Sequence, residues 1–159
     1  MRNRIISLSL ITLAFLVNAC TGDIPLYEEN KSTEGGWFYK DSVDFNVYID
    51  DTLHKYNIYL NLRNTRDYPY NNFFMYVQMI TPDGKMRMDT AEVFLANEYT
   101  GEWNGSGSSG IYSNSFLFRH DKYFPVVGEY QFSIQQAMRY EPVNEILDVG
   151  IKIERARKK

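Results

Sequence analysis

The chain has 159 residues, of which 44% are hydrophobic and 16% aromatic, and its formal net charge is −3 at pH 7. An acidic chain without a basic stripe does not have the composition of a nucleic-acid-binding protein. A single cysteine excludes an intramolecular disulfide and a thiolate metal cluster, and the length is that of one domain around one core.

The first predicted element is a cleaved signal peptide over residues 1–19. Arg2 and Arg4 precede a long uncharged run, which is typical of an export signal, and this run is shorter than the roughly 20 apolar residues of a membrane-spanning helix. It ends in the letters VNAC, where Ala19 precedes Cys20, and this ending resembles a bacterial lipobox. We therefore expect acylation of Cys20 and attachment to a membrane without crossing it. The alternative is an ordinary export signal with an incidental cysteine.

Residues 20–36 follow the signal peptide and are polar, with two glycines at their end and no sustained apolar period. This composition predicts a flexible tether that starts at the lipidated Cys20. The folded domain is then expected to begin at Trp37 and to occupy residues 37–159 as a single unit with a short basic tail.

Beyond Trp37 the apolar residues recur with a period of two. The pattern is clearest in VDFNVYID (43–50), where Val43, Phe45 and Val47 alternate with polar side chains. Strict alternation over several segments predicts half-buried antiparallel strands. The other segments with this pattern are 54–63, 72–80, 128–138 and 146–154.

Turn residues separate these runs, most clearly in Pro82-Asp83-Gly84, because proline presets φ, aspartate caps the turn and glycine accepts a positive φ. We count seven to nine strands and find no long helical period. The most economical architecture is an all-β, antiparallel β-sandwich, of which the jelly roll is one form.

A glycine-rich segment at 101–114 contains Gly105, Gly107 and Gly110 at the spacing of a dinucleotide-binding loop. That loop requires a strand before it and a helix after it. Here the following residues alternate like a strand, so no helix N-terminus is offered to a phosphate. The segment is predicted to be a loop or bulge at a sheet edge, and no cofactor is predicted.

Several short motifs extend over most of the mature chain. They are Arg63-Asn64 followed by Tyr68-Pro69-Tyr70, the Gly101-x-Trp103-x-Gly105 loop, Gln136-Ala137-Met138-Arg139 and Asp148-Val149-Gly150. With the surrounding sequence they resemble the gliding motility lipoprotein GldH family of Bacteroidota. The serine-rich stretch 106–109 departs from the simplest family pattern, which leaves a fixed contact by that loop in doubt.

The resemblance implies a membrane-anchored envelope lipoprotein that is a non-enzymatic accessory component of gliding motility and of the type IX secretion machinery. Its implied partners are proteins of those assemblies and the membrane that holds Cys20. The residues Thr21-Gly22-Asp23 lack a dense acidic run, which favours the outer membrane and its periplasmic face.

Catalysis finds little support in the sequence. His54 and His120 are the only histidines and lie far apart along the chain, so no metal-ligand spacing is present, and a solvated or hydrogen-bonded histidine is the simpler interpretation. No nucleophile elbow is present either. We predict no catalytic residue and no metal site.

A glycan-binding surface lipoprotein is the alternative function. Tyr48, Tyr59, Tyr99, Trp103 and Tyr112 are candidates for a platform under sugar rings, although aromatic residues also suit strands and loop anchors. Trp103, which is flanked by glycines, is the one we expect to pack over the end of a sheet.

Three charged residues, Arg63, Arg139 and Asp148, are candidates for structural or partner contacts together with Trp103. Arg139 is expected at a strand end, where a bidentate pair with Asp148 would fix how the last two strands meet. The basic tail at 155–159 is expected to be a solvated terminus, with anionic headgroups as the alternative contact.

Three tripeptides resemble the acceptor pattern for O-glycosylation of exported Bacteroidota proteins. They begin at Asp41, Asp51 and Asp89 and offer Ser42, Thr52 and Thr90 as candidate glycan carriers. Three residues make a short pattern, so the native intact mass is the test.

Overall fold

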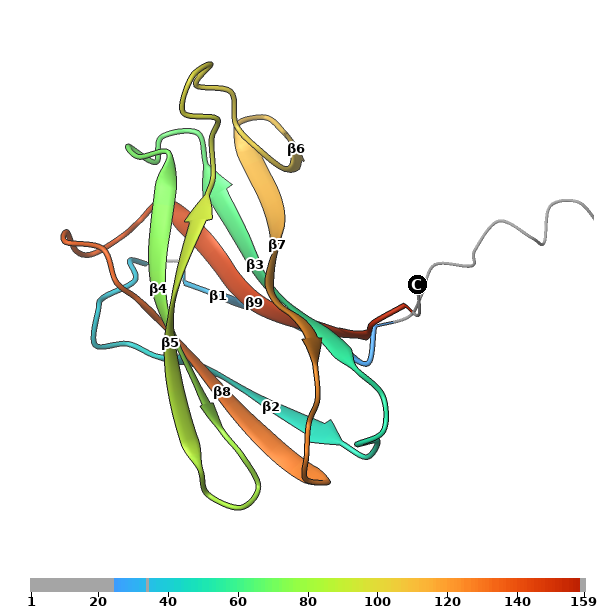
Figure 1. Ribbon diagram of the computed structural model, residues 1–159. Coiled ribbons are helices and arrows are strands. Elements are labelled where there is room, and N and C mark those ends of the chain that lie inside the picture. The colour runs from blue at the N-terminus through green and yellow to red at the C-terminus, as the bar shows by residue number, and fades with distance from the viewer. Residues whose placement is uncertain (1–24, 34, 158–159) are drawn as a thin grey trace, which may run out of the picture.

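The computed structural model describes residues 25–33 and 35–157, which form strands, turns and loops (Figure 1). This part of the chain contains no long apolar helix of the kind that crosses a bilayer. Its strands are β1 (Tyr27–Ser32), β2 (Val43–Ile49), β3 (Tyr56–Thr65), β4 (Asn72–Ile80), β5 (Met86–Phe94), β6 (Ser106–Ser108), β7 (Ile111–Lys122), β8 (Gly128–Gln136) and β9 (Ile146–Arg155).

The strands form two sheets that pack face to face. One sheet has the order β1-β9-β3-β7-β6 and the other the order β2-β8-β4-β5, and every strand pair is antiparallel. Apart from the short β6, these are the two four-strand orders of a jelly roll. The predicted antiparallel sandwich is therefore confirmed, and its form is the jelly roll.

The core lies between the sheets and is built by the predicted alternation. In β3, Ile58, Leu60 and Leu62 are each at most 2% exposed, while their neighbours along the strand are half-buried on the outer face. Trp37 stacks on Phe73 with ring centroids 5.8 Å apart. Burying each large apolar side chain contributes about 1.5–3 kcal/mol, so the inward faces hold the two sheets together.

The predicted tether over residues 20–36 is wrong for residues 27–32, which form β1. All of β1 pairs with β9, from Tyr27 opposite Ile153 to Ser32 opposite Asp148. The strand lacks an apolar alternation because it lies at the sheet edge, where an inward position accepts a polar side chain. The folded domain thus begins before Trp37. The predicted signal peptide and Cys20 lie outside the described residues.

The two sides of the sandwich, where one sheet ends against the other, differ in how they are covered. On one side β1 lies next to β2, and Lys31 Nζ donates to the carbonyl oxygen of Asp44 at 2.6 Å. On the other side β5 ends its sheet, and β6 covers β7 only at residues 111–113. We call these the closed side, formed by β1 and β2, and the open side, formed by β5 and β7.

Candidate functional site

A polar groove lies on the outer face of the five-stranded sheet, with a volume of about 370 Å³. All five strands of this sheet, the short β6 included, supply its lining, so residues from β1 and β9, far apart in the sequence, meet there. All but one of the lining side chains are polar or charged. They are Glu28, Asn30, Asn61, Leu62, Arg63, Ser106, Ser113, Asn114, Ser115 and Asp148.

Strand register explains why these side chains meet. Asn61 lies opposite Ser115 on β7 and opposite Gly150 on β9. Two residues further along β3, Arg63 lies opposite Ser113 and Asp148. Because side chains alternate between the faces of a strand, the same alternation that buries Leu62 places polar groups in rows on the outer face.

An amide network crosses the groove from β1 to β7. Asn61 Nδ2 donates to Glu28 Oε1 at 3.1 Å and to Asn30 Oδ1 at 3.2 Å, and Asn61 Oδ1 accepts from Ser115 Oγ at 2.7 Å. Gly150 lies between these strands and makes the approach possible, since a Cβ there would lie 1.9 Å from Asn30 Oδ1. The network therefore depends on a strand position without a side chain.

An ion pair ends the network, with Arg63 Nε against Asp148 Oδ2. The predicted pairing of Arg139 with Asp148 is wrong. Arg139 follows β8, which belongs to the four-stranded sheet, so the last two strands are not sheet neighbours. Arg139 is exposed and enters none of the ion pairs found among the described residues. Arg63, Asp148 and the exposed Arg139 remain candidate partner-contact residues.

Trp103 lies in the segment between β5 and β6 and bridges to Ala96. Its ring stacks on Tyr112 with centroids 5.5 Å apart and an interplanar angle of 22°, and it packs partly buried against the core. The expected packing of Trp103 at a sheet end agrees with this position. Ser106, which lines the polar groove, comes three positions later.

The five candidate aromatic residues do not form one platform, because they belong to different surfaces. Tyr48 is on β2 in the other sheet, and Tyr99 is in the exposed loop after β5. Tyr59 is on the outer face near the groove, but Lys152 Nζ lies 4.2 Å from its ring centroid. The structure therefore excludes a single platform of these five residues and agrees with the alternative that they are strand residues and loop anchors.

The glycine-rich segment forms an edge hairpin, in which β6 pairs with β7, as expected for a loop at a sheet edge. Its glycines permit close backbone approach. A Cβ on Gly107 would lie 1.9 Å from the carbonyl oxygen of Ile111, and Gly105 has a φ of 83°. These positions explain the glycine spacing without a nucleotide.

The candidate glycan carriers lie at three different places. Ser42 is exposed directly before β2, and Thr90 is exposed within β5. Thr52 is half-buried in the turn between β2 and β3. Exposure thus favours Ser42 and Thr90 as acceptors, and all three remain predictions.

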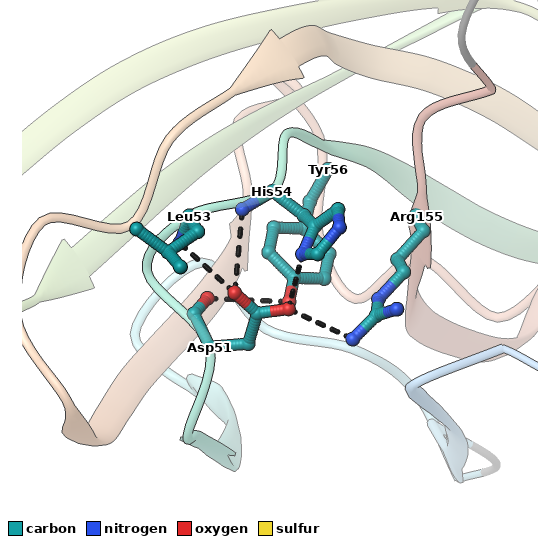
Figure 2. Close-up of polar contacts among 5 residues, drawn as sticks. All are labelled: Asp51, Leu53, His54, Tyr56 and Arg155. Atoms are coloured by element: carbon teal, nitrogen blue, oxygen red, sulfur yellow. Dashed lines mark hydrogen bonds and ion pairs between the residues drawn. The ribbon is translucent and has the colours of Figure 1, made fainter.

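Sequence reasoning missed a polar cluster centred on Asp51, shown in Figure 2. Asp51 Oδ1 accepts from the backbone amides of Leu53 at 2.9 Å and His54 at 3.3 Å. Oδ2 lies 2.5 Å from His54 Nδ1 and 2.8 Å from an Arg155 guanidinium nitrogen, and Tyr56 donates to the Asp51 carbonyl at 3.2 Å. The Leu53 amide first, and then His54, lower the pKa of Asp51.

This cluster ties the turn after β2 to the end of β9 and accounts for His54. An aspartate at the start of a short polar turn is the signal that would have revealed it. The described residues contain no group of three histidine, cysteine, aspartate or glutamate side chains arranged to hold a metal ion. The arrangement of Asp51 suits a structural clamp.

Comparison with known proteins gives one family and two curated relatives. The family model "GldH lipoprotein" matches residues 25–153. Gliding motility lipoprotein GldH of Flavobacterium johnsoniae is 33% identical over 152 residues, covering 91% of this chain and 93% of the relative. A GldH homolog of Christiangramia forsetii is 32% identical over 139 residues, covering 82% and 84%.

Solved structures give a weaker likeness. The VP2 subviral particle of infectious bursal disease virus has 11% identity and a TM-score of 0.35, over 83% of this chain and 32% of the viral chain. The infectious bursal disease virus Gt strain has the same identity and TM-score, over 80% and 30%.

Proposed function

Because this chain belongs to the GldH lipoprotein family, we propose that it is a membrane-anchored, non-enzymatic component of the gliding apparatus and of the associated type IX secretion machinery. The family match over residues 25–153 carries the proposal, since it includes β1 to β8 and β9 as far as the buried Ile153. Both relatives are named as motility lipoproteins and cover most of the chain.

The lipoprotein identity of the family supports Cys20 as the acylated residue and the cell envelope as the location. Within the envelope we place the protein on the outer membrane, facing the periplasm. The polar segment Thr21-Gly22-Asp23 supports this side because it lacks a dense acidic run. A proteinase added to intact cells should leave the protein uncut and should cut it once the outer membrane is opened.

The polar groove supports a binding role for the outer face. Its charged groups are already joined to one another, as Arg63 is to Asp148, and such a paired surface suits recognition of a partner more than proton transfer. Arg63 is 43% exposed, so its remaining guanidinium donors are accessible to a carboxylate or carbonyl of an envelope protein.

Crosslinking and affinity purification of the lipidated protein from its native envelope test this role. Gliding or secretion components should copurify with the wild-type protein, whereas the Cys20→Ala variant should lose its anchor and leave the membrane fraction. Arg63→Ala should weaken their recovery, while Lys40→Ala, which removes an exposed cation outside the groove, serves as the control. Equal recovery from all variants would contradict a role for the groove.

Glycan binding is the second candidate function, and the composition of the groove favours it. Amide and hydroxyl groups from Asn30, Asn61 and Ser115 are suited to sugar hydroxyls. Trp103, an aromatic residue of the kind that stacks on sugar rings, precedes the groove residue Ser106 by three positions in the sequence. Calorimetric titration with envelope polysaccharides tests it, since binding should fall with Asn61→Ala. Absence of heat from every polysaccharide would exclude this candidate.

A further inference from the structure

A second groove runs along the open side of the sandwich, between β5 and β7. It consists of three hollows of about 370, 540 and 380 Å³. The first and second share Phe118 and Arg119, and the first and third share Met79, Arg87 and Lys122. Because neighbouring hollows share lining residues, they lie side by side along β5 and β7, and we call the row of three the side groove.

Strand edges border the side groove. Along its length β5 pairs only with β4, so the other edge of this nine-residue strand has no backbone partner in the described chain. Unpaired edges are templates for an added strand. Natural proteins protect such an edge with a proline, a bulge or charged side chains. The β5 register to β4 runs without interruption and contains no proline, so the edge is guarded only by the charged side chains of β5 itself, which are Arg87, Asp89 and Glu92.

The floor of the side groove is apolar. Phe116 and Phe118 from β7 and Met79 from β4 are partly buried there and pack against the core. On the outer face of β5, Met86 and Met88 are 61% and 58% exposed. An extended peptide laid along β5 would thus find apolar contacts on both of its faces.

A bulge in β7 directs a cation into the side groove. Leu117 lies opposite Tyr59, whereas Arg119 lies opposite Ile58, so Phe118 is an extra residue in the strand. A bulge of this kind re-aims the side chain that follows it. Here Arg119 reaches an Asp89 carboxylate oxygen on β5 at 2.6 Å, and both side chains are more than a third exposed.

The charged side chains that line the side groove are four cations and three acids, one of which, Glu92, lies in the second hollow, so their net charge is +1, whereas that of the whole chain is −3. In its first and third hollows the acids Asp83 and Asp89 are paired with Lys85 and Arg119. Arg87 and Lys122 line both hollows and enter no ion pair among those found in the described residues. Two cations beside an apolar floor are complementary to a ligand that carries carboxylates among apolar side chains.

We propose that the side groove binds an extended segment of a partner protein, in which acidic and apolar residues alternate, and that this segment pairs with β5 as an added strand. Backbone hydrogen bonds along β5 supply affinity, and alternate side chains enter the groove and set specificity. The acidic residues of the segment pair with Arg87 and Lys122. The exposed Asp89–Arg119 pair is weak enough to yield to such a ligand.

A single strand suits this groove better than a second copy of the chain. Pairing of β5 with another β5 would bring the other strands of the second copy's sheet with it, because β5 is joined to β4 and through it to β8 and β2. A lone peptide has no attached sheet and reaches both the edge and the floor.

The test measures hydrogen exchange of the purified full-length lipoprotein in detergent with a ten-residue synthetic peptide, in which valine alternates with glutamate and threonine. At a peptide concentration of 100 times Kd, exchange in residues 86–94 should slow by up to roughly 100-fold, while β1 should be unchanged. The same peptide N-methylated at every second residue should give no protection, because it cannot complete the backbone ladder.

Charge variants complete the test. Arg87→Glu with Lys122→Glu should weaken binding at least about tenfold, while the control pair Lys40→Glu with Arg139→Glu, which makes the same change in net charge outside the side groove, should bind like the wild type. No protection of β5 by the unmodified peptide would overturn the proposal. Protection of β5 that needs no peptide and rises with protein concentration would overturn it in favour of a second copy.

Discussion

The closed side and the open side of the sandwich differ in how their edge strands are covered. A jelly roll leaves an edge strand at each end of its two sheets. On the closed side, Lys31 of β1 reaches across to the Asp44 carbonyl and lies 5.1 Å from the Phe45 ring centroid. On the open side, only the exposed Asp89–Arg119 pair has been found to join β5 and β7 by charge.

With the side groove as the proposed binding site, this difference separates the side that stabilises the sandwich from the side that is available to a ligand. The closed side uses a segment from the start of the domain to complete a sheet and seal the core rim. The open side keeps an edge without a backbone partner and an apolar floor with cations beside it. Changes on the closed side should therefore cost stability, whereas changes on the open side should alter binding.

The largest expected effect comes from Gly150→Val on β9, the strand that holds β1 of the closed side in its sheet. A Cβ at this position would lie 1.9 Å from Asn30 Oδ1 and 2.5 Å from the Glu29 carbonyl oxygen, so β1 would have to shift away from β9. We expect a loss of about 2–3 kcal/mol in the free energy of unfolding, measured by urea denaturation. Lys152→Ala, two residues along the same strand, is the control and should cost less than about 1 kcal/mol.

A smaller loss is expected from Lys31→Met, which keeps the apolar stem and removes the ammonium group. The hydrogen bond to the Asp44 carbonyl is exposed, so its loss should reduce the free energy of unfolding by about 0.5–1 kcal/mol. Thermal unfolding measures it. Lys85→Met in the β4–β5 turn is the matched change on the open side, and an equal loss there would remove the contrast between the sides.

The open-side ion pair should contribute still less. A double-mutant cycle with Asp89→Ala and Arg119→Ala should give a coupling energy of about 0.2–0.5 kcal/mol, because both side chains are more than a third exposed. The coupling should decline at 1 M salt, where the Debye length is about 3 Å. A coupling energy that stays large in salt would mean that this side is held as firmly as the other.

The smallest effect concerns pH and the turn that leaves β2. The pKa of Asp51 is lowered in the folded protein, first by the Leu53 amide. The stability from this carboxylate is therefore present above the unfolded pKa of about 3.9 and is lost as the pH falls through the lower folded value. Protection of the amides of residues 52–55 against hydrogen exchange, measured relative to the intrinsic rate at each pH, should fall below about pH 4 in the wild type.

Asp51→Asn supplies the control for that titration. The variant should show fast exchange in the turn at every pH, since it lacks the charge that holds His54 and Arg155. If the variant retained the wild-type acid dependence, another group would be responsible for it.

The sequence predicted strands well where one face of each strand is buried. In β3 every second residue is apolar, so the period was visible without the structure. Sequence reasoning did not predict β1, because its inward positions include the charged residues Glu29 and Lys31. At the edge of the sandwich the Lys31 side chain covers the Phe45 ring, and its ammonium group still reaches solvent. Edge strands of this kind derive their order from backbone pairing, which leaves no apolar period to read.

The sequence identified residues of the candidate site but did not predict which of them form an ion pair. Arg63 and Asp148 were both identified from the sequence, but their contact depends on the register between β3 and β9, which separate segments set only when they pair. The assignment of Arg139 as the partner assumed that consecutive strands are neighbours, and the jelly roll places β8 and β9 in different sheets.

The presence of β1 in the sheet shortens the linker between the lipid anchor and the folded domain. With Cys20 acylated as proposed, only residues 21–26 separate it from β1, and six residues span at most about 22 Å. The domain would then be confined to a thin layer above the bilayer. A partner in the same membrane would then meet it by a nearly two-dimensional search at high local concentration, so that modest affinity at either proposed binding groove would be enough for stable assembly.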